Sequence, residues 1–194
     1  MTRRSALAAL GAAVVALGAV SAYLLLPTAY KDGEGGALAA HNETGHSLVA
    51  VDPTGKTTSS WTFGLRLCLR ETTPVTLEAV EPVTTVGQGF RLAGIGVRRF
   101  DAGEGHTPIF SVDGFPPPTA MVPDRIDPIP GFEVTTACGG AIGPRTELLV
   151  GLTREGDDGG GWQGLRVRYR VSGRPATVDV NQDFLICGAS VSCD

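Results

Sequence analysis

The sequence predicts an all-β fold: an antiparallel, two-layer β-sandwich of about seven strands, preceded by one N-terminal transmembrane helix. Glycine and proline are frequent, with 27 and 13 copies, and they separate short segments in which apolar and polar residues alternate. An uncharged apolar run near the N-terminus predicts the helix. A closed β-barrel is the alternative topology for the same strands.

The chain of 194 residues has room for one ordinary domain and a targeting segment. We divide it into a signal anchor or signal peptide (1–26), a flexible linker (27–47) and an extracytoplasmic β domain (48–194). The linker is rich in glycine, alanine and polar residues and has no apolar period. His41 and His46 fall in it, and we expect them to be solvated rather than bound to a metal.

The N-terminal segment has the pattern of a membrane-spanning helix. Arg3 and Arg4 precede an uncharged run over residues 5–26. As a helix rising about 1.5 Å per residue, this run spans ~33 Å, close to the ~30 Å hydrocarbon thickness of a bilayer. By the positive-inside rule the two arginines stay in the cytoplasm, which places the C-terminal domain outside the cell membrane.

Two alternatives to a retained anchor stay open. Val20-Ser21-Ala22 is a small-residue cleavage site, so the domain could instead be secreted after cleavage, although the apolar run continues beyond that site. Residues 2–7, Thr-Arg-Arg-Ser-Ala-Leu, also resemble the twin-arginine export signal.

Strands follow one another along the β domain. Trp61, Phe63, Leu65, Leu67 and Leu69 alternate with polar or small residues, as in a strand with one buried face. The turn 71–74 then predicts a hairpin with the strand that begins at Val75. Further strands are expected at 90–100, 132–138, 148–152, 165–171, 176–180 and 184–187.

This order of strands from Trp61 to Cys187, with Trp61 and Tyr169 as core aromatics, resembles exported bacterial immunoglobulin-like and fibronectin-III-like β-sandwich proteins. The resemblance implies an immunoglobulin-like sandwich and no particular activity. The chain departs from antibody domains because no tryptophan lies between Cys68 and Cys138 at the expected place.

Four cysteines in an exported domain favour two disulfides, and a metal site is disfavoured because the sequence has no Cys-x-x-Cys pair. We expect Cys68 with Cys187 and Cys138 with Cys193, because the first and last strands of a sandwich often lie side by side. A small loop closed by Cys187 and Cys193 is the competing pairing.

The segment 101–131 holds seven of the 13 prolines and several large apolar residues. Such a segment is too apolar for a free linker, so we expect it to pack on the sandwich. It is also the first place to look for a recognition surface.

Motifs for catalysis, nucleotide binding or metal binding are absent from the sequence, so no catalytic residue, cofactor or metal ligand is assigned. A hydrolase that uses carboxylates would draw on Asp113, Asp124 and Asp127, with His106 in the same segment. An extracytoplasmic metal carrier is a third hypothesis. Solvent-facing ion pairs are expected between Arg66, Arg168 or Arg170 and acids such as Glu78 or Glu147.

Without residues 1–26 the chain carries 14 basic and 20 acidic residues, a net charge of −6. Because nucleic acids and anionic lipids bind basic surfaces, this balance argues against a nucleic-acid partner. The leading hypothesis is a membrane-anchored or secreted cell-envelope protein that acts by binding or structural association, with an envelope protein or glycan of unknown identity as its partner.

Overall fold

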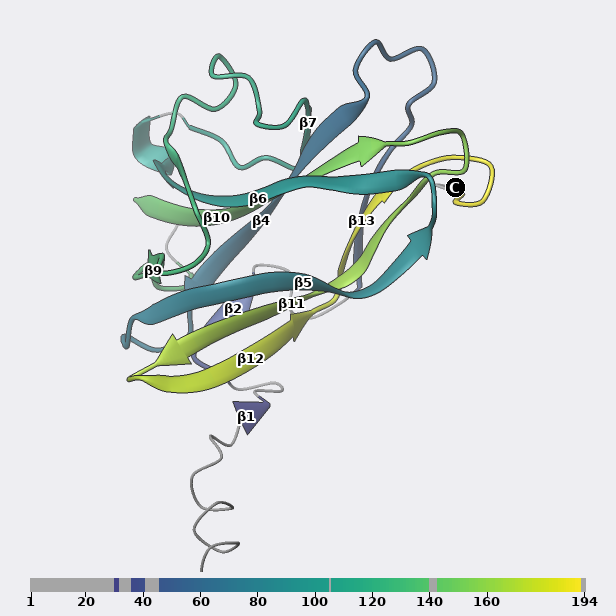
Figure 1. Cartoon of the computed structure of the whole chain (residues 1–194). Helices are drawn as coiled ribbons and strands as arrows, with labels where there is room; N and C mark the ends of the chain where they lie inside the picture. Colours follow the sequence, from purple (N-terminus) through teal and green to yellow (C-terminus); the bar gives the residue numbers. More distant parts are fainter. Residues whose placement is uncertain (1–29, 32–35, 41–45, 105, 140–142, 193–194) are drawn as a thin grey trace, which may run out of the picture.

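The computed structural model of the chain describes residues 30–31, 36–40, 46–104, 106–139 and 143–192. In this part of the chain the fold is all-β, with one short 3-10 turn, η1 (Ala102–Glu104). Two sheets pack face to face as a sandwich (Figure 1). The transmembrane helix expected at 5–26 lies outside the described residues, and none of the described residues forms a helix with the length and apolarity to span a bilayer.

Sheet A is built around the long strand β11. Its seven strands are β9 (Glu133–Val134), β5 (Val75–Gly87), β11 (Gly160–Val171), β12 (Arg174–Val180), β13 (Gln182–Ile186), β3 (Ser47–Val51) and β1 (Tyr30–Lys31). β5 pairs with β11 along one side. On the other side of β11, β13 pairs with its first residues and β12 pairs with its second half. β1 and β3 add to these as parallel strands, so the sheet is mixed.

Sheet B has three long antiparallel strands and three short ones. The long strands are β4 (Ser60–Leu69), β10 (Pro144–Arg154) and β6 (Phe90–Asp101), with β10 in the centre. The short strands β2 (Leu38–Ala40) and β7 (Ser111–Asp113) pair with the free side of β4, and β8 (Ile126–Asp127) pairs with the free side of β6. Both lateral edges of sheet B are therefore partly covered.

The core lies between the sheets and follows the alternation in the sequence. The five alternate apolar residues of β4, from Trp61 to Leu69, are buried. From sheet A, Leu165, Val167 and Tyr169 of β11 are fully buried as well. The rings of Phe63 and Phe184 stack across the two layers with centroids 5.1 Å apart. Removal of this apolar surface from water is the main force that holds the layers together.

Three expectations about the architecture are wrong. The structure has 13 strands in its described part rather than about seven, because β1, β2, β7, β8 and β9 are too short to leave a pattern in the sequence. β4 and β5 do not form a hairpin, since the turn at 71–74 leads from sheet B to sheet A. The segment 27–47 is not simply a linker, because β1 pairs with β12 and Leu38, Ala39 and Ala40 are buried in β2.

The expected disulfide pairing is wrong too. Cys68 is bonded to Cys138, with their Cα atoms 4.9 Å apart. Cys68 occupies an outward position of β4 and Cys187 follows the last strand of the opposite sheet, so these two residues do not meet. Cys138 reaches Cys68 because its segment runs along the end of β4, where the Cys138 N–H donates to the Leu69 carbonyl. Cys187 is also disulfide-bonded; Cys193 lies outside the described residues, so the C-terminal loop stays a prediction.

The segment 106–127, here called the covering segment, packs on the outer face of sheet B (Figure 1), and the chain after it returns to the core and to β9 of sheet A. This packing confirms the expectation for the proline-rich loop. The covering segment buries a second apolar layer, because Leu149 and Phe100 face outward from sheet B and yet are inaccessible to solvent. As a result, β10 has buried residues on both faces.

Candidate functional site

Close contact between sheet B and the covering segment depends on glycine. Phe115 lies over Gly94 and Gly151, which are neighbours in the register of β6 and β10. A Cβ on Gly151 would lie 2.2 Å from Cγ of Phe115, and one on Gly94 would lie 2.4 Å from its Cε1. Gly96 gives the same space to Ile126. Because these strand glycines have no side chain, the covering segment can approach the backbone of sheet B closely and exclude solvent from this face of the sheet.

Beneath the covering segment lies a buried ionic cluster. Arg98 of β6 is 1% exposed and Glu147 of β10 is 0% exposed. Nε of Arg98 donates to Oε2 of Glu147 at 2.8 Å, and its Nη1 donates to Oδ2 of Asp124 at 2.7 Å. Nη2 donates to the Thr107 carbonyl, and the guanidinium also lies 4.5 Å from the centroid of the Phe100 ring. The partners that a buried cation requires are thus present.

Glu147 was expected to face solvent, and that expectation is wrong because the covering segment closes over it. Its second oxygen, Oε1, accepts the Ile109 N–H at 2.8 Å. Burial raises the pKa of Glu147 above its ordinary value, and the attraction of Arg98 and the Ile109 N–H opposes that rise. Desolvation therefore outweighs the favourable contacts at this carboxylate.

The three aspartates considered for hydrolysis have separate partners. Asp124 is held by Arg98, and its Oδ1 lies 3.0 Å from Nδ1 of His106. Asp127 pairs with Arg125 at the exposed end of the covering segment. Asp113 lies opposite Trp61 in the register of β7 and β4. Hydrogen bonds or ion pairs between any two of these aspartates are absent from the described part of the structure.

A groove opens at one lateral edge of the sandwich, between β3 of sheet A and β4 of sheet B. Its volume is about 210 Å³. Leu48 of β3 and Phe110 of the covering segment line it, and these two residues are 48% and 72% exposed. Gly64 and Glu147 lie on the β4 side, where the Phe110 carbonyl accepts the Gly64 N–H.

Arg66 is the cation of this groove, and it also lines a smaller hollow of about 130 Å³ beside the Cys68–Cys138 disulfide. It lies opposite Glu147 in the sheet register, but the expected solvent-facing ion pair between them is not formed, because that carboxylate is buried and bound by Arg98. Burial lowers the pKa of Arg66, and the nearby Arg145 lowers it further, while Glu147 opposes the shift. Arg66 makes no hydrogen bond or ion pair with any described residue. By contrast, the expected pair between Arg170 and Glu78 is confirmed.

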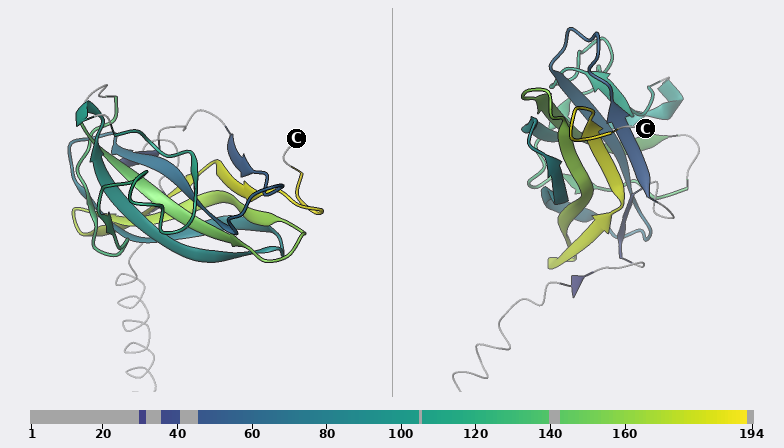
Figure 2. Two further views of the ribbon diagram at one scale, coloured as in Figure 1. Left: turned by 90° about the horizontal axis from the view of Figure 1, so that it is seen from above. Right: turned by 90° about the vertical axis from the view of Figure 1, so that its right-hand side faces the viewer.

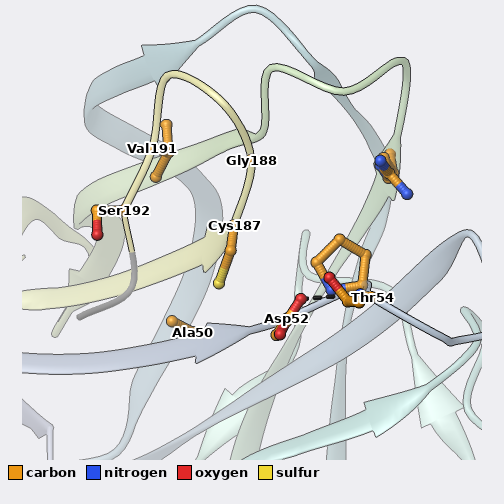
Figure 3. Close-up of a pocket in the computed structure, with 9 residues that line it drawn as sticks. Ala50, Asp52, Thr54, Cys187, Gly188, Val191 and Ser192 are labelled. Carbon is orange, nitrogen blue, oxygen red and sulfur yellow. Dashed lines mark hydrogen bonds between the residues drawn. The ribbon is translucent and has the colours of Figure 1, made fainter.

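A wider cavity of about 550 Å³ lies at the end of β3 (Figure 3). Figure 3 shows Ala50 and Asp52 on one side of it and the segment from Cys187 to Ser192 on the other. Asp52 accepts the Thr54 N–H, and this bond lowers the pKa of its carboxyl. The groove and the wider cavity are therefore both lined by residues of β3.

His46, expected to be solvated, is 66% exposed and in addition contacts a buried acid. Its Nε2 lies 3.0 Å from Oδ2 of Asp183, while Oδ1 of Asp183 accepts the Gly164 N–H. His41 lies outside the described residues. Sequence reasoning missed Asp183, Arg98 and the depth of Glu147, because nothing local marks a polar residue of a strand as buried. Groups of three or more potential metal ligands are absent from the described residues.

Neither a protein-family model nor a curated protein matches the chain. Among solved structures, the VesB protease of Vibrio cholerae is similar with a TM-score of 0.34 and 5% identity. The match covers 77% of this chain and 31% of the protease chain, so the chain spans about a third of that protein. The fold and its edges, rather than this distant similarity, define the class of protein as an all-β sandwich with one covered face.

Proposed function

We propose that the chain is a cell-envelope protein with an immunoglobulin-like sandwich that acts by binding or structural association, without catalysis. Residues 5–26 would hold it in the cell membrane, with the sandwich outside the cytoplasm. The arginine pair before that segment supports this orientation. The Cys68–Cys138 disulfide supports an oxidising compartment. Secretion after cleavage would place the same domain in the same compartment.

One observation carries the binding role: a groove with two exposed apolar walls, Leu48 and Phe110, beside an arginine with no acidic partner of its own. Single exposed apolar side chains are common on monomeric proteins, whereas exposed apolar surface gathered in one place and bordered by polar residues marks an interaction site or a binding groove. The half-buried Arg66 adds a polar contact that fixes the orientation of what binds.

Crosslinking in intact cells tests this function. A photo-crosslinking residue at position 110 should yield a defined crosslinked product, and the same residue at Leu92, which is 44% exposed on β6, should not. Fractionation in the same cells should place the full chain in the membrane or outside it. A full chain that is recovered from the cytosol with reduced cysteines, or that gives no specific product, would contradict the proposal.

A secreted hydrolase is the second candidate, and the contact between His106 and Asp124 favours it. Asp124 orients the imidazole through Nδ1, and the ring is partly exposed at 29%. An oriented imidazole of this kind can act as a general base. Hydrolysis of an ester, peptide or glycoside substrate that disappears in His106→Gln, at unchanged stability, would establish this function. Equal rates for the parent and the variant would exclude it.

A further inference from the structure

β3 presents an open backbone edge. It pairs in parallel with β13, where the Ser47 N–H donates to Asn181 and the Val51 carbonyl accepts the Cys187 N–H. In a parallel ladder, alternate residues of a strand bond to the same neighbour. The backbone groups of Leu48 and Ala50 therefore point away from β13, and in the described structure no strand pairs with that side of β3. β3 lies beside β13 near the C-terminal end in both views of Figure 2.

This edge lacks the features that protect other edges of the same sheet. β5 carries Glu78, Glu81 and Pro82 along its open length, and β9 covers its beginning. β12 carries Arg174, Pro175 and Asp179, and β1 covers part of it. Charge, proline and short cover strands all prevent an edge from pairing with another chain. β3 reads Ser-Leu-Val-Ala-Val, without charge, proline or glycine.

The groove described above lies on this open side, whereas the wider cavity lies between the end of β3 and the segment that continues β13. Leu48 lines the groove, and Ala50 lines the wider cavity. A strand added to β3 would therefore run past the groove, with its alternate side chains directed toward sheet B. There they would meet the groove and, at its far wall, the unpaired guanidinium of Arg66.

We propose that the open edge of β3 accepts an extended segment of a partner polypeptide as an added strand, and that this segment places a carboxylate side chain against Arg66. Backbone hydrogen bonds to Leu48 and Ala50 would supply affinity, and the groove would supply selectivity, as in other cases of strand addition. The inference rests on the binding function proposed above and names the partner's chemistry.

Charge favours such a partner over a second copy of this chain. Val49 and Val51 pack against the core, so they are the residues of β3 that face sheet B. If two copies paired through β3, the valines of one copy would be the side chains that face the groove of the other copy. Arg66 would then be desolvated further without an anion, which is unfavourable. An acidic side chain gives a charge-assisted hydrogen bond instead.

Selection from a random ten-residue peptide library against the full chain in detergent tests the proposal. We expect the enriched peptides to contain Asp or Glu among alternating apolar residues. Arg66→Gln should weaken their binding about tenfold or more, as expected for loss of a charge-assisted bond. Leu48→Pro should do the same, because proline removes the outward N–H and leaves the pairing with β13 intact. Arg168→Gln, at an exposed position of β11, is the matched control and should bind within twofold of the parent.

The outcomes separate this inference from the proposed function. Peptides that bind Arg66→Gln and Leu48→Pro as tightly as the parent, or that are basic, overturn the inference. A product crosslinked through position 110 without any enriched peptide also overturns it, while the binding function stands. If neither a crosslinked product nor an enriched peptide is found, both the inference and the proposed binding function are overturned. A concentration-dependent dimer that Leu48→Pro abolishes would identify a second copy as the occupant and likewise overturn the inference.

Discussion

Arg98 and Glu147 face each other across β6 and β10, and both are sealed from solvent by a segment that belongs to neither strand. Arg98 binds Glu147 in the sheet and Asp124 in the covering segment. Glu147 in turn accepts the Ile109 N–H of that segment. The pair therefore links sheet B to the covering segment. We expect the stability of the sheet and the packing of the covering segment to depend on each other.

Replacement of Arg98 by Met should destabilise the domain strongly. It leaves Glu147 and Asp124 without their cation, and breaking a buried pair in this way costs about 3–5 kcal/mol. Urea unfolding at pH 7 measures the change. The loss should be smaller at pH 5, where a buried carboxylate without its cation takes up a proton. Arg168→Met is the control, and an equally small change in both variants would contradict the account.

The pH dependence of stability should carry the signature of Glu147. Burial raises its pKa above the ordinary 4.5, so the folded state binds this proton more tightly than the unfolded state. Its contribution to stability is thus complete below pH 4.5 and is lost as the pH rises through the higher folded pKa. The free energy of unfolding of the parent, minus that of Glu147→Gln, should fall over this range. A rise would show that Arg98 lowers this pKa instead; Glu104→Gln, at an exposed position, is the control.

Gly151→Ala should destabilise the domain by about 1–3 kcal/mol, the usual range for an overpacked site. The added methyl group would overlap the ring of Phe115. The same substitution in a Phe115→Ala background should cost much less, because the ring that it meets is gone. Thermal or urea unfolding of the parent, the two single variants and the double variant measures the cost of Gly151→Ala in each background. Equal costs in the two backgrounds would show that Phe115 does not lie on Gly151.

Loss of the disulfide should lower stability without abolishing the sandwich. Cys68 and Cys138 are 70 residues apart, and a bridge of this kind contributes about 2–4 kcal/mol. The variant with both cysteines changed to Ser should unfold at lower urea concentration. Mass spectrometry of a non-reduced digest should find the Cys68 and Cys138 peptides joined. A Cys68–Cys187 peptide pair would contradict the structure.

The long strands could be predicted from the sequence because their alternation reflects burial of one face. β4 and the second half of β11 follow that rule, from Trp61 to Leu69 and from Leu165 to Tyr169. The rule says nothing about which sheet a strand joins. The turn 71–74 therefore suggested a hairpin, although it connects a strand of sheet B to a strand of sheet A. The predicted cysteine pairing was wrong for the same reason, because it assumed that the first and last strands are neighbours in one sheet.

The candidate site was harder to predict because it is made by distant contacts. Packing of the proline-rich segment on the sandwich followed from its apolar content, but the burial of Glu147 depends on that packing and on glycines in two other strands. The groove at Leu48 depends on parallel pairing between β3 and β13, which lie 135 residues apart at Ser47 and Gln182. β3 itself follows a segment that reads as a linker.

Hydrogen exchange at β3 tests the central claim, an open edge that takes an added strand, most directly. In the free chain the amides of Leu48 and Ala50 should exchange at least about tenfold faster than those of Val49 and Val51, which point toward β13. An enriched acidic peptide should slow the first two selectively. Four amides that are equally protected before any peptide is added, or a bound peptide that leaves Leu48 and Ala50 exchanging as before, would contradict it.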